Sequence, residues 1–185
     1  MRSVFVTAMW LCSAALPSHG QEQGSSARTQ DSLLATYEQA LLALRDSTVP
    51  VRSATSQFQR DLQLAGEVTV ISRAARLNQA CATLQGSLEA AEPVFRPSRA
   101  PSGRAREASR TFLGEMEVLE RALDTHCLDG LPQDGPGVWA DSLRAWGPFH
   151  TANLQRVLQS YDGAAFVFAQ AVGVRLEPGR TGIVP

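Results

Sequence analysis

Apolar residues recur along this chain at steps of three and four positions, the spacing that places side chains on one face of an α-helix. Residues 67–92 show the most regular pattern, because their steps alternate between four and three over the whole segment. Similar stripes occupy residues 29–65, 104–127 and 149–172. The stripe within 67–92 consists of Val70, Ala74, Leu77, Cys81, Leu84, Leu88 and Ala91.

Proline and glycine divide these segments. Pro50 interrupts the first stripe, so we expect that helix to be kinked or broken there. Residues 138–146 lie between a loop rich in glycine and proline and the pair Gly147-Pro148, and they predict a short extra helix. No convincing strand alternation occurs in the sequence. The pattern therefore predicts an all-α, antiparallel, up-down four-helix bundle with a kinked first helix and a short helix before the last one.

The first twenty residues have the pattern of a secretory signal peptide. Arg2 precedes a short apolar run from Val4 to Leu16, and small residues follow Pro17 where a signal peptidase would cut. The run is too short for a permanent transmembrane helix. We expect a signal peptide at 1–20, a flexible segment at 21–28, a helical bundle domain at 29–174 and a flexible tail at 175–185. The mature chain would then be periplasmic or extracellular, with no transmembrane span.

Export changes the meaning of the cysteines, since Cys12 would leave with the signal peptide. Cys81 and Cys127 would remain, in a compartment that permits disulfides. A bridge would close a loop of about 46 residues and stabilise the fold by roughly 3–4 kcal/mol. Helix geometry opposes it, because two ideal helices over 67–92 and 104–127 would leave the cysteines about 18 Å apart along the axis. The redox argument favours the bridge nevertheless.

Several enzyme classes lack their essential residues. The chain contains no lysine, so P-loop, Schiff-base and Ser–Lys chemistry is excluded. No G-x-S-x-G, H-E-x-x-H or G-x-G-x-x-G motif occurs. Beyond residue 20 the net charge is −2, from 16 arginines and 18 acidic residues, which gives no general attraction to nucleic acid. We therefore predict a non-catalytic protein, a binding or structural component of the cell envelope.

His126 and His150 provide the alternative hypothesis, a haem or a transition metal in the bundle. The two histidines end one helix and begin the next, so an up-down bundle would place them at the same level, with Met116 as a further candidate. No C-x-x-C-H or Glu-x-x-His motif accompanies them, so the main prediction contains no cofactor. A catalytic thiol at Cys127 with His126 as its base is disfavoured, because neighbours on a helix point about 100° apart.

Arginines concentrate in the connection between the second and third long helices and just beyond it. Guanidinium groups bind phosphate, acidic polymers or anionic lipid through paired hydrogen bonds, so the cluster could recognise an anionic envelope component. A solvated connection kept soluble by its charge is the favoured interpretation. The candidate anion-binding residues are Arg96, Arg99, Arg104, Arg106 and Arg110.

Two further groups leave alternatives open. Trp139, Trp146 and Phe149 either line a ligand groove or seal one end of the bundle. Small residues on the last helix either allow a neighbouring helix to approach closely or lie beneath a bound molecule, and we favour close packing. These small residues are Gly163, Ala164, Ala165 and Ala169.

Overall fold

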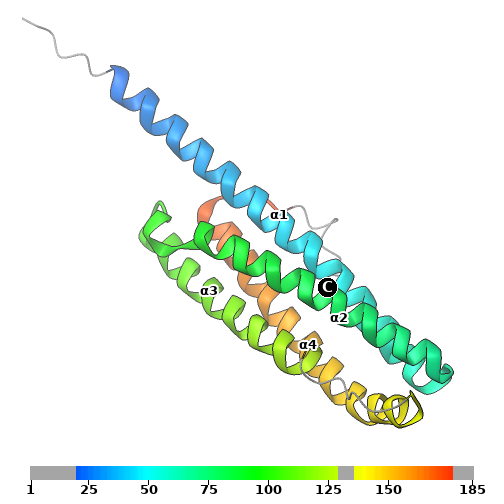
Figure 1. Cartoon of the computed structure of the whole chain (residues 1–185). Coiled ribbons are helices and arrows are strands. Elements are labelled where there is room, and N and C mark those ends of the chain that lie inside the picture. Colours follow the sequence, from blue (N-terminus) through cyan, green and yellow to red (C-terminus); the bar gives the residue numbers. More distant parts are fainter. Residues whose placement is uncertain (1–19, 129–135, 177–185) are drawn as a thin grey trace, which may run out of the picture.

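Four long helices pack along one another in the computed structural model, which describes residues 20–128 and 136–176 (Figure 1). Short helical turns η1 and η2 join α2 to α3, and a π-helical turn, η3, continues α3. The described residues contain no strand, so the predicted all-α four-helix bundle is confirmed. The elements are α1 (Gly20–Leu64), α2 (Glu67–Ala91), η1 (Glu92–Phe95), η2 (Pro97–Arg99), α3 (Gly103–Leu123), η3 (Asp124–Leu128) and α4 (Pro136–Val172).

Both internal prolines lie inside continuous helices. Pro50 stands within α1 with its ring exposed, so the first helix is not broken there. Pro148 stands within α4, and the short extra helix predicted at 138–146 is instead the first part of that helix. Pro148 removes one backbone hydrogen bond from the helix. The side chains of Leu143, before the proline, and Leu154, after it, are both buried in the core, and this packing stabilises a continuous helix.

The sequence analysis interpreted Gly147 as part of a helix break. In the structure this glycine lies inside α4 and packs against α1. A Cβ atom at this position would lie 2.5 Å from Leu62 Cδ1 and 3.2 Å from Phe58 Cε1, both on α1. Any side chain here would force the buried Leu62 to shift, so glycine favours the close approach of α4 to α1. The carbonyl of Gly147 accepts a hydrogen bond of 2.7 Å from Thr151 Oγ1, inside the same helix.

Two of the predicted boundaries differ from the structure. Residues 21–28, expected to be loose, belong to α1, since no proline interrupts the chain between Gly20 and Pro50 and an existing helix extends readily. Leu176, which the prediction placed in a flexible tail from residue 175, is half-buried and packs against the core. The predictions for residues 1–19, for the loop at 129–135 and for 177–185 lie outside the described residues.

The core contains the apolar stripes that the sequence indicated. The seven buried residues of α2 are the seven members of the predicted stripe. A cluster of five aromatic rings fills the part of the core beside the connection between α2 and α3. Phe95 lies in this cluster although it belongs to the connection between α2 and α3, and it is fully buried. The rings are Tyr37, Phe95, Phe112, Tyr161 and Phe168.

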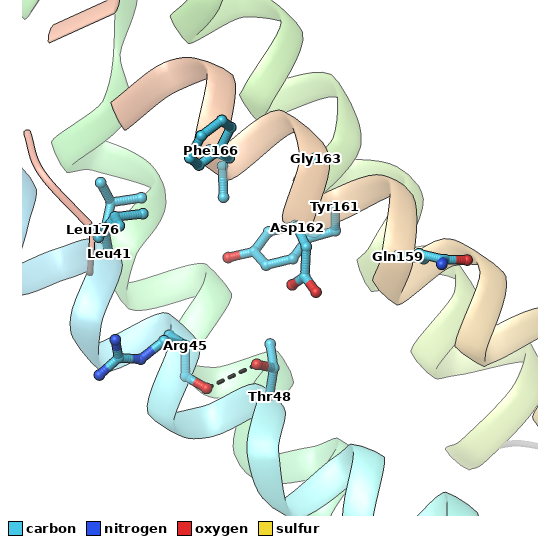
Figure 2. A pocket seen from close by; sticks show the side chains of 10 residues that line it. Leu41, Arg45, Thr48, Gln159, Tyr161, Asp162, Gly163, Phe166 and Leu176 are labelled. Carbon is cyan, nitrogen blue, oxygen red and sulfur yellow. Dashed lines mark hydrogen bonds between the residues drawn. The ribbon is translucent and has the colours of Figure 1, made fainter. Parts of the chain in front are cut away.

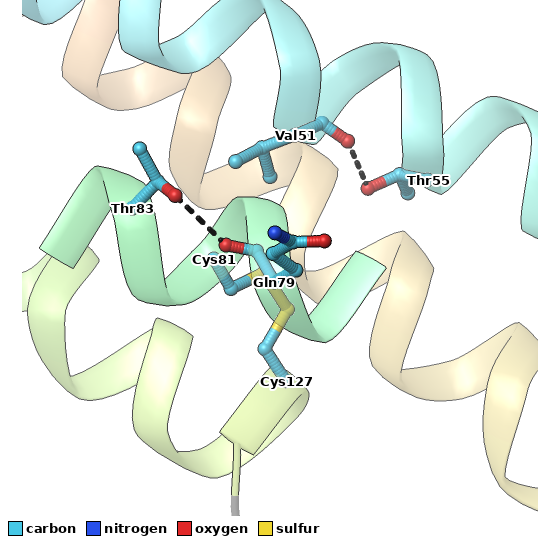
Figure 3. Close-up of a disulfide and its surroundings, with 6 residues drawn as sticks. All are labelled: Val51, Thr55, Gln79, Cys81, Thr83 and Cys127. Carbon is cyan, nitrogen blue, oxygen red and sulfur yellow. Dashed lines mark hydrogen bonds between the residues drawn. A yellow bond between two sulfur atoms is a disulfide. The ribbon is translucent and has the colours of Figure 1, made fainter. Parts of the chain in front are cut away.

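Cys81 and Cys127 form a disulfide, as predicted, with their Cα atoms 6.3 Å apart (Figure 3). Both cysteines are buried, Cys81 on α2 and Cys127 in the π-helical turn η3. One turn away, Gln85 Nε2 donates a 3.0 Å hydrogen bond to Asp124 Oδ1. The two segments therefore run antiparallel in this register.

The axial offset that opposed the bridge disappears because α3 does not begin level with the end of α2. The connection lies beyond the end of α2 in Figure 1. Ser109, in the second turn of α3, donates its hydroxyl hydrogen to the carbonyl of Phe95, in η1. The first turns of α3 therefore pack on the connection, and each cysteine lies a similar distance along its helix from that contact. The error came from assuming a compact hairpin loop.

No helix among the described residues combines the length and apolar character that crossing a membrane requires.

Candidate functional site

A pocket of about 380 Å³ opens between the middle of α1 and the second half of α4 (Figure 2). This volume lies within the range of roughly 300–1,000 Å³ that is usual for small-molecule sites. Apolar and aromatic side chains form most of its wall, and Leu176, beyond the end of α4, closes one side. The pocket is lined by Leu41, Arg45, Thr48, Gln159, Tyr161, Asp162, Gly163, Ala165, Phe166 and Leu176.

Small residues on α4 make room for this pocket. Gly163 and Ala165 line it, and nothing lies within 4 Å of the position where a Cβ of Gly163 would stand. Ala169, one turn further along, is buried in the core instead. The two interpretations of the small residues thus divide along the helix: close packing applies at Ala169, whereas Gly163 and Ala165 border open space.

Arg45 is the cationic group at the pocket with hydrogen-bonding capacity to spare. Its side chain is 19% exposed, and its partner Asp46 is the adjacent residue, at 3.3 Å, with a carboxylate that is 72% exposed. An ion pair with such an exposed carboxylate contributes little to stability. A guanidinium group has five N–H donors, so Arg45 can also bind an anion that enters the pocket.

Asp162, the carboxylate at the pocket, is already paired. It accepts a hydrogen bond from Arg52 on α1, whose guanidinium also donates to the carbonyl of Leu158 at 3.1 Å. Burial raises the pKa of Asp162, while the charge and hydrogen bond of Arg52 lower it. The two charges largely compensate each other, and Arg45, whose partner is the exposed Asp46, is the other charged residue that lines the pocket.

Tyr161 supplies a protonated phenol beside the apolar wall. Its ring is buried and packs against Phe112 at a centroid distance of 5.5 Å. Burial, assisted by the charge of Asp162, raises the pKa of this phenol far above its ordinary value. The hydroxyl group therefore remains protonated at any physiological pH.

The two histidines meet beside the first half of α4, at one level of the bundle, as the up-down topology predicted. His126 Nδ1 and His150 Nδ1 lie 2.9 Å apart. Trp146 stacks on His150 with a centroid distance of 4.3 Å and an interplanar angle of 9°. Phe149 contacts both imidazole rings edge to face, and its side chain is 65% exposed. The aromatic residues thus flank the histidine pair.

Both histidines favour the neutral form. Burial lowers the pKa of His126. Burial and the neighbouring His126 charge lower the pKa of His150, against a hydrogen bond to the backbone of Thr125 that raises it. One neutral ring can donate to the other through Nδ1, while two protonated rings would repel each other.

The haem alternative does not fit this geometry. A haem iron held by two histidines needs the ring nitrogens about 4 Å apart, with the porphyrin between them, whereas the two Nδ1 atoms are 2.9 Å apart. Met116 is buried in the core, about 15 Å along the helix from His126. Among the described residues, no group of three or more His, Cys, Asp and Glu side chains is arranged to hold a metal ion.

All five arginines of the candidate anion-binding cluster are exposed. Arg110 pairs with Glu107 at 3.1 Å on the surface of α3. Arg99 lies near α1, since its positive charge lowers the pKa of Tyr37 against the larger effect of burial. Their exposure suits either of the two interpretations given above, and anion binding here stays a prediction.

Carboxylates gather around Glu120 on α3. Burial raises the pKa of Glu120, and the nearby charges of Glu89, Glu92, Glu117 and Asp124 raise it further. The folded state thus favours protonated Glu120, so its ionised form costs stability at neutral pH. Replacing Glu120 with glutamine should raise the melting temperature by about 1–3 °C at pH 7. Thermal melts followed by circular dichroism would measure the difference.

That gain should shrink as the pH falls through the raised pKa of Glu120 toward 4.5, because the wild-type carboxyl group then becomes neutral too. Glu107 provides the matched control on the same helix: it is 74% exposed and pairs with Arg110. The variant Glu107→Gln should show no increase. If both variants raised the melting temperature equally, the cause would be the change in net charge and not the surroundings of Glu120.

These features define a class: an all-α, disulfide-linked four-helix bundle with an apolar pocket between α1 and α4. No protein-family model, no curated protein and no solved structure matches the chain. The functional argument therefore rests on the residues themselves.

Proposed function

We propose that this chain is an exported, non-catalytic binding protein of the cell envelope. Its ligand would be an amphiphile with one apolar chain and an anionic head group, such as a fatty acid. The pocket between α1 and α4 is the observation that carries this proposal.

The residues that line the pocket suit both the apolar chain and the anionic head group of such a ligand. Leu41, Phe166 and Leu176 offer an apolar wall, which favours burial of a hydrocarbon chain by about 0.8 kcal/mol per methylene group. Arg45 lies at the pocket with weakly used N–H donors, which suits a carboxylate. Asp162 does not oppose an anion strongly, because Arg52 compensates its charge.

Export is supported by the disulfide and by the expected signal peptide. Disulfides persist in oxidising compartments and are rare in the cytosol, and the Cys81–Cys127 bond joins two buried positions of the core. The non-catalytic part rests on the sequence, which lacks lysine and the common catalytic motifs. Cys127, considered above as a catalytic thiol, is bonded to Cys81.

Filling the pocket should weaken binding of the ligand. Ala165 lines the pocket and is half-buried, so the variant Ala165→Trp would place a large ring in the space for the ligand. We expect at least a tenfold increase in the Kd of a dansyl-labelled fatty acid, or about 1.4 kcal/mol. Fluorescence titration of the full chain measures this. Ala152→Trp, at an exposed position of the same helix, is the control and should bind as the wild type does.

A second variant tests the head group. Arg45→Gln should weaken binding of the fatty acid while leaving the affinity for the fatty alcohol of equal length unchanged, because only the acid carries a charge. Equal loss for both ligands would contradict the role of Arg45. Absence of saturable binding to the wild type, or full binding to Ala165→Trp, would overturn the proposed function.

A further inference from the structure

The strongest unassigned feature outside the pocket is the contact between His126 and His150. We propose that these two imidazoles form a bidentate site for a divalent transition metal ion, with copper(II) preferred. The inference is independent of the pocket, since α4 carries the two features on different turns. It rests on the distance between the two ring nitrogens.

The separation of the nitrogens suits a chelate. With metal–nitrogen bonds of about 2.0–2.1 Å, two nitrogens 2.9 Å apart subtend an angle of about 90° at the metal. Neighbouring ligands in a square-planar or tetragonal site make this angle, the geometry that copper(II) and nickel(II) prefer. A tetrahedral zinc ion would need the nitrogens roughly 3.3 Å apart. Copper(II) is also the divalent ion that nitrogen ligands bind most tightly.

The nitrogens are available without loss of a proton to solvent. In the neutral pair one Nδ1 carries hydrogen, and the other uses its lone pair to accept that hydrogen bond. Moving the single Nδ1 proton to Nε2 of the same ring leaves both Nδ1 lone pairs free. Two neutral imidazoles can then bind the metal, with no net change in the protons held by the rings.

The surrounding structure holds the two rings in place. Cys127 follows His126 directly and is bonded to Cys81 of α2, which anchors the π-helical turn that carries His126. Trp146 lies flat against His150, one turn away on α4. Ligands fixed before binding lose less conformational entropy when the metal arrives. The π-helical turn itself is the kind of helix irregularity that often occurs at functional sites.

The fluorescence of Trp146 provides a way to measure copper(II) binding. Its ring stacks on His150 at 4.3 Å, so a copper(II) ion bound to that histidine should quench its fluorescence. We expect saturable quenching of the untagged full chain by copper(II) near pH 7.5, and weaker binding of zinc(II) in competition. The electron paramagnetic resonance spectrum of the copper complex should show hyperfine coupling to imidazole nitrogen.

Single variants separate the histidine pair from weak surface sites. His126→Gln and His150→Gln should each raise the Kd for copper(II) at least tenfold, because a chelate becomes a single ligand. Glu107, an exposed carboxylate on α3, supplies the control, and Glu107→Gln should bind copper(II) as the wild type does. Circular dichroism of each variant establishes that the helices remain. Quenching that does not saturate, or that persists with unchanged Kd in His126→Gln, would overturn the proposal.

Discussion

Replacing Cys81 and Cys127 together with alanine should reduce the free energy of unfolding by about 3–4 kcal/mol. The bridge closes a loop with a sequence separation of 46 residues, so its removal gives the unfolded chain much more conformational freedom. For a chain of this size the melting temperature should fall by roughly 6–15 °C. Chemical denaturation and thermal melts followed by circular dichroism would measure both quantities.

Reduction of the unmodified protein is the control for the two substitutions. If the bond alone matters, the reduced wild type and the double alanine variant should melt at similar temperatures. Mass spectrometry before and after alkylation verifies the oxidation state of each sample. A double variant as stable as the oxidised wild type would contradict the stabilising role of the bridge.

Truncating Phe95 to alanine should cost about 3–5 kcal/mol, the usual range for removing a buried phenylalanine ring. The ring is fully buried. Its centroid lies 4.9 Å from that of Phe112 and 5.3 Å from that of Phe168, both edge to face. The loss would leave a cavity where α1, α3 and α4 meet the connection after α2. Urea denaturation would show a lower midpoint with little change in slope.

Phe149→Ala is the matched control, since it removes the same side chain from a position that is 65% exposed. Its cost should stay within about 0.5 kcal/mol. Similar losses from both variants would show that Phe95 does not anchor the connection. The comparison therefore tests whether the connection between α2 and α3 is part of the core.

The fold followed from the sequence where periodicity was strong. In α2 every predicted stripe residue is buried, because an amphipathic helix has only one apolar face to offer a core. Proline and glycine positions were less informative about where helices end. Pro148 and Gly147 read as a break, yet α4 continues through them because burial of its neighbours outweighs one missing hydrogen bond.

The candidate site was predictable only in part. The topology brought His126 and His150 to one level, and the structure confirms their proximity. The pocket could not be derived from the pattern, since Gly163 and Ala165 look the same in sequence as the close-packed Ala169. Whether a small residue faces a neighbouring helix or open space depends on how far apart the helix axes lie.

The sequence by itself determined the helical class, the buried faces of the helices and the two cysteines available for a bridge, because each depends on residue spacing or residue type alone. Only the tertiary structure decided the register of α2 against α3, the burial of Phe95 and the space between α1 and α4. These features depend on contacts between residues far apart in the chain. Local periodicity carries no information about such contacts, since the same stripe can pack in several registers.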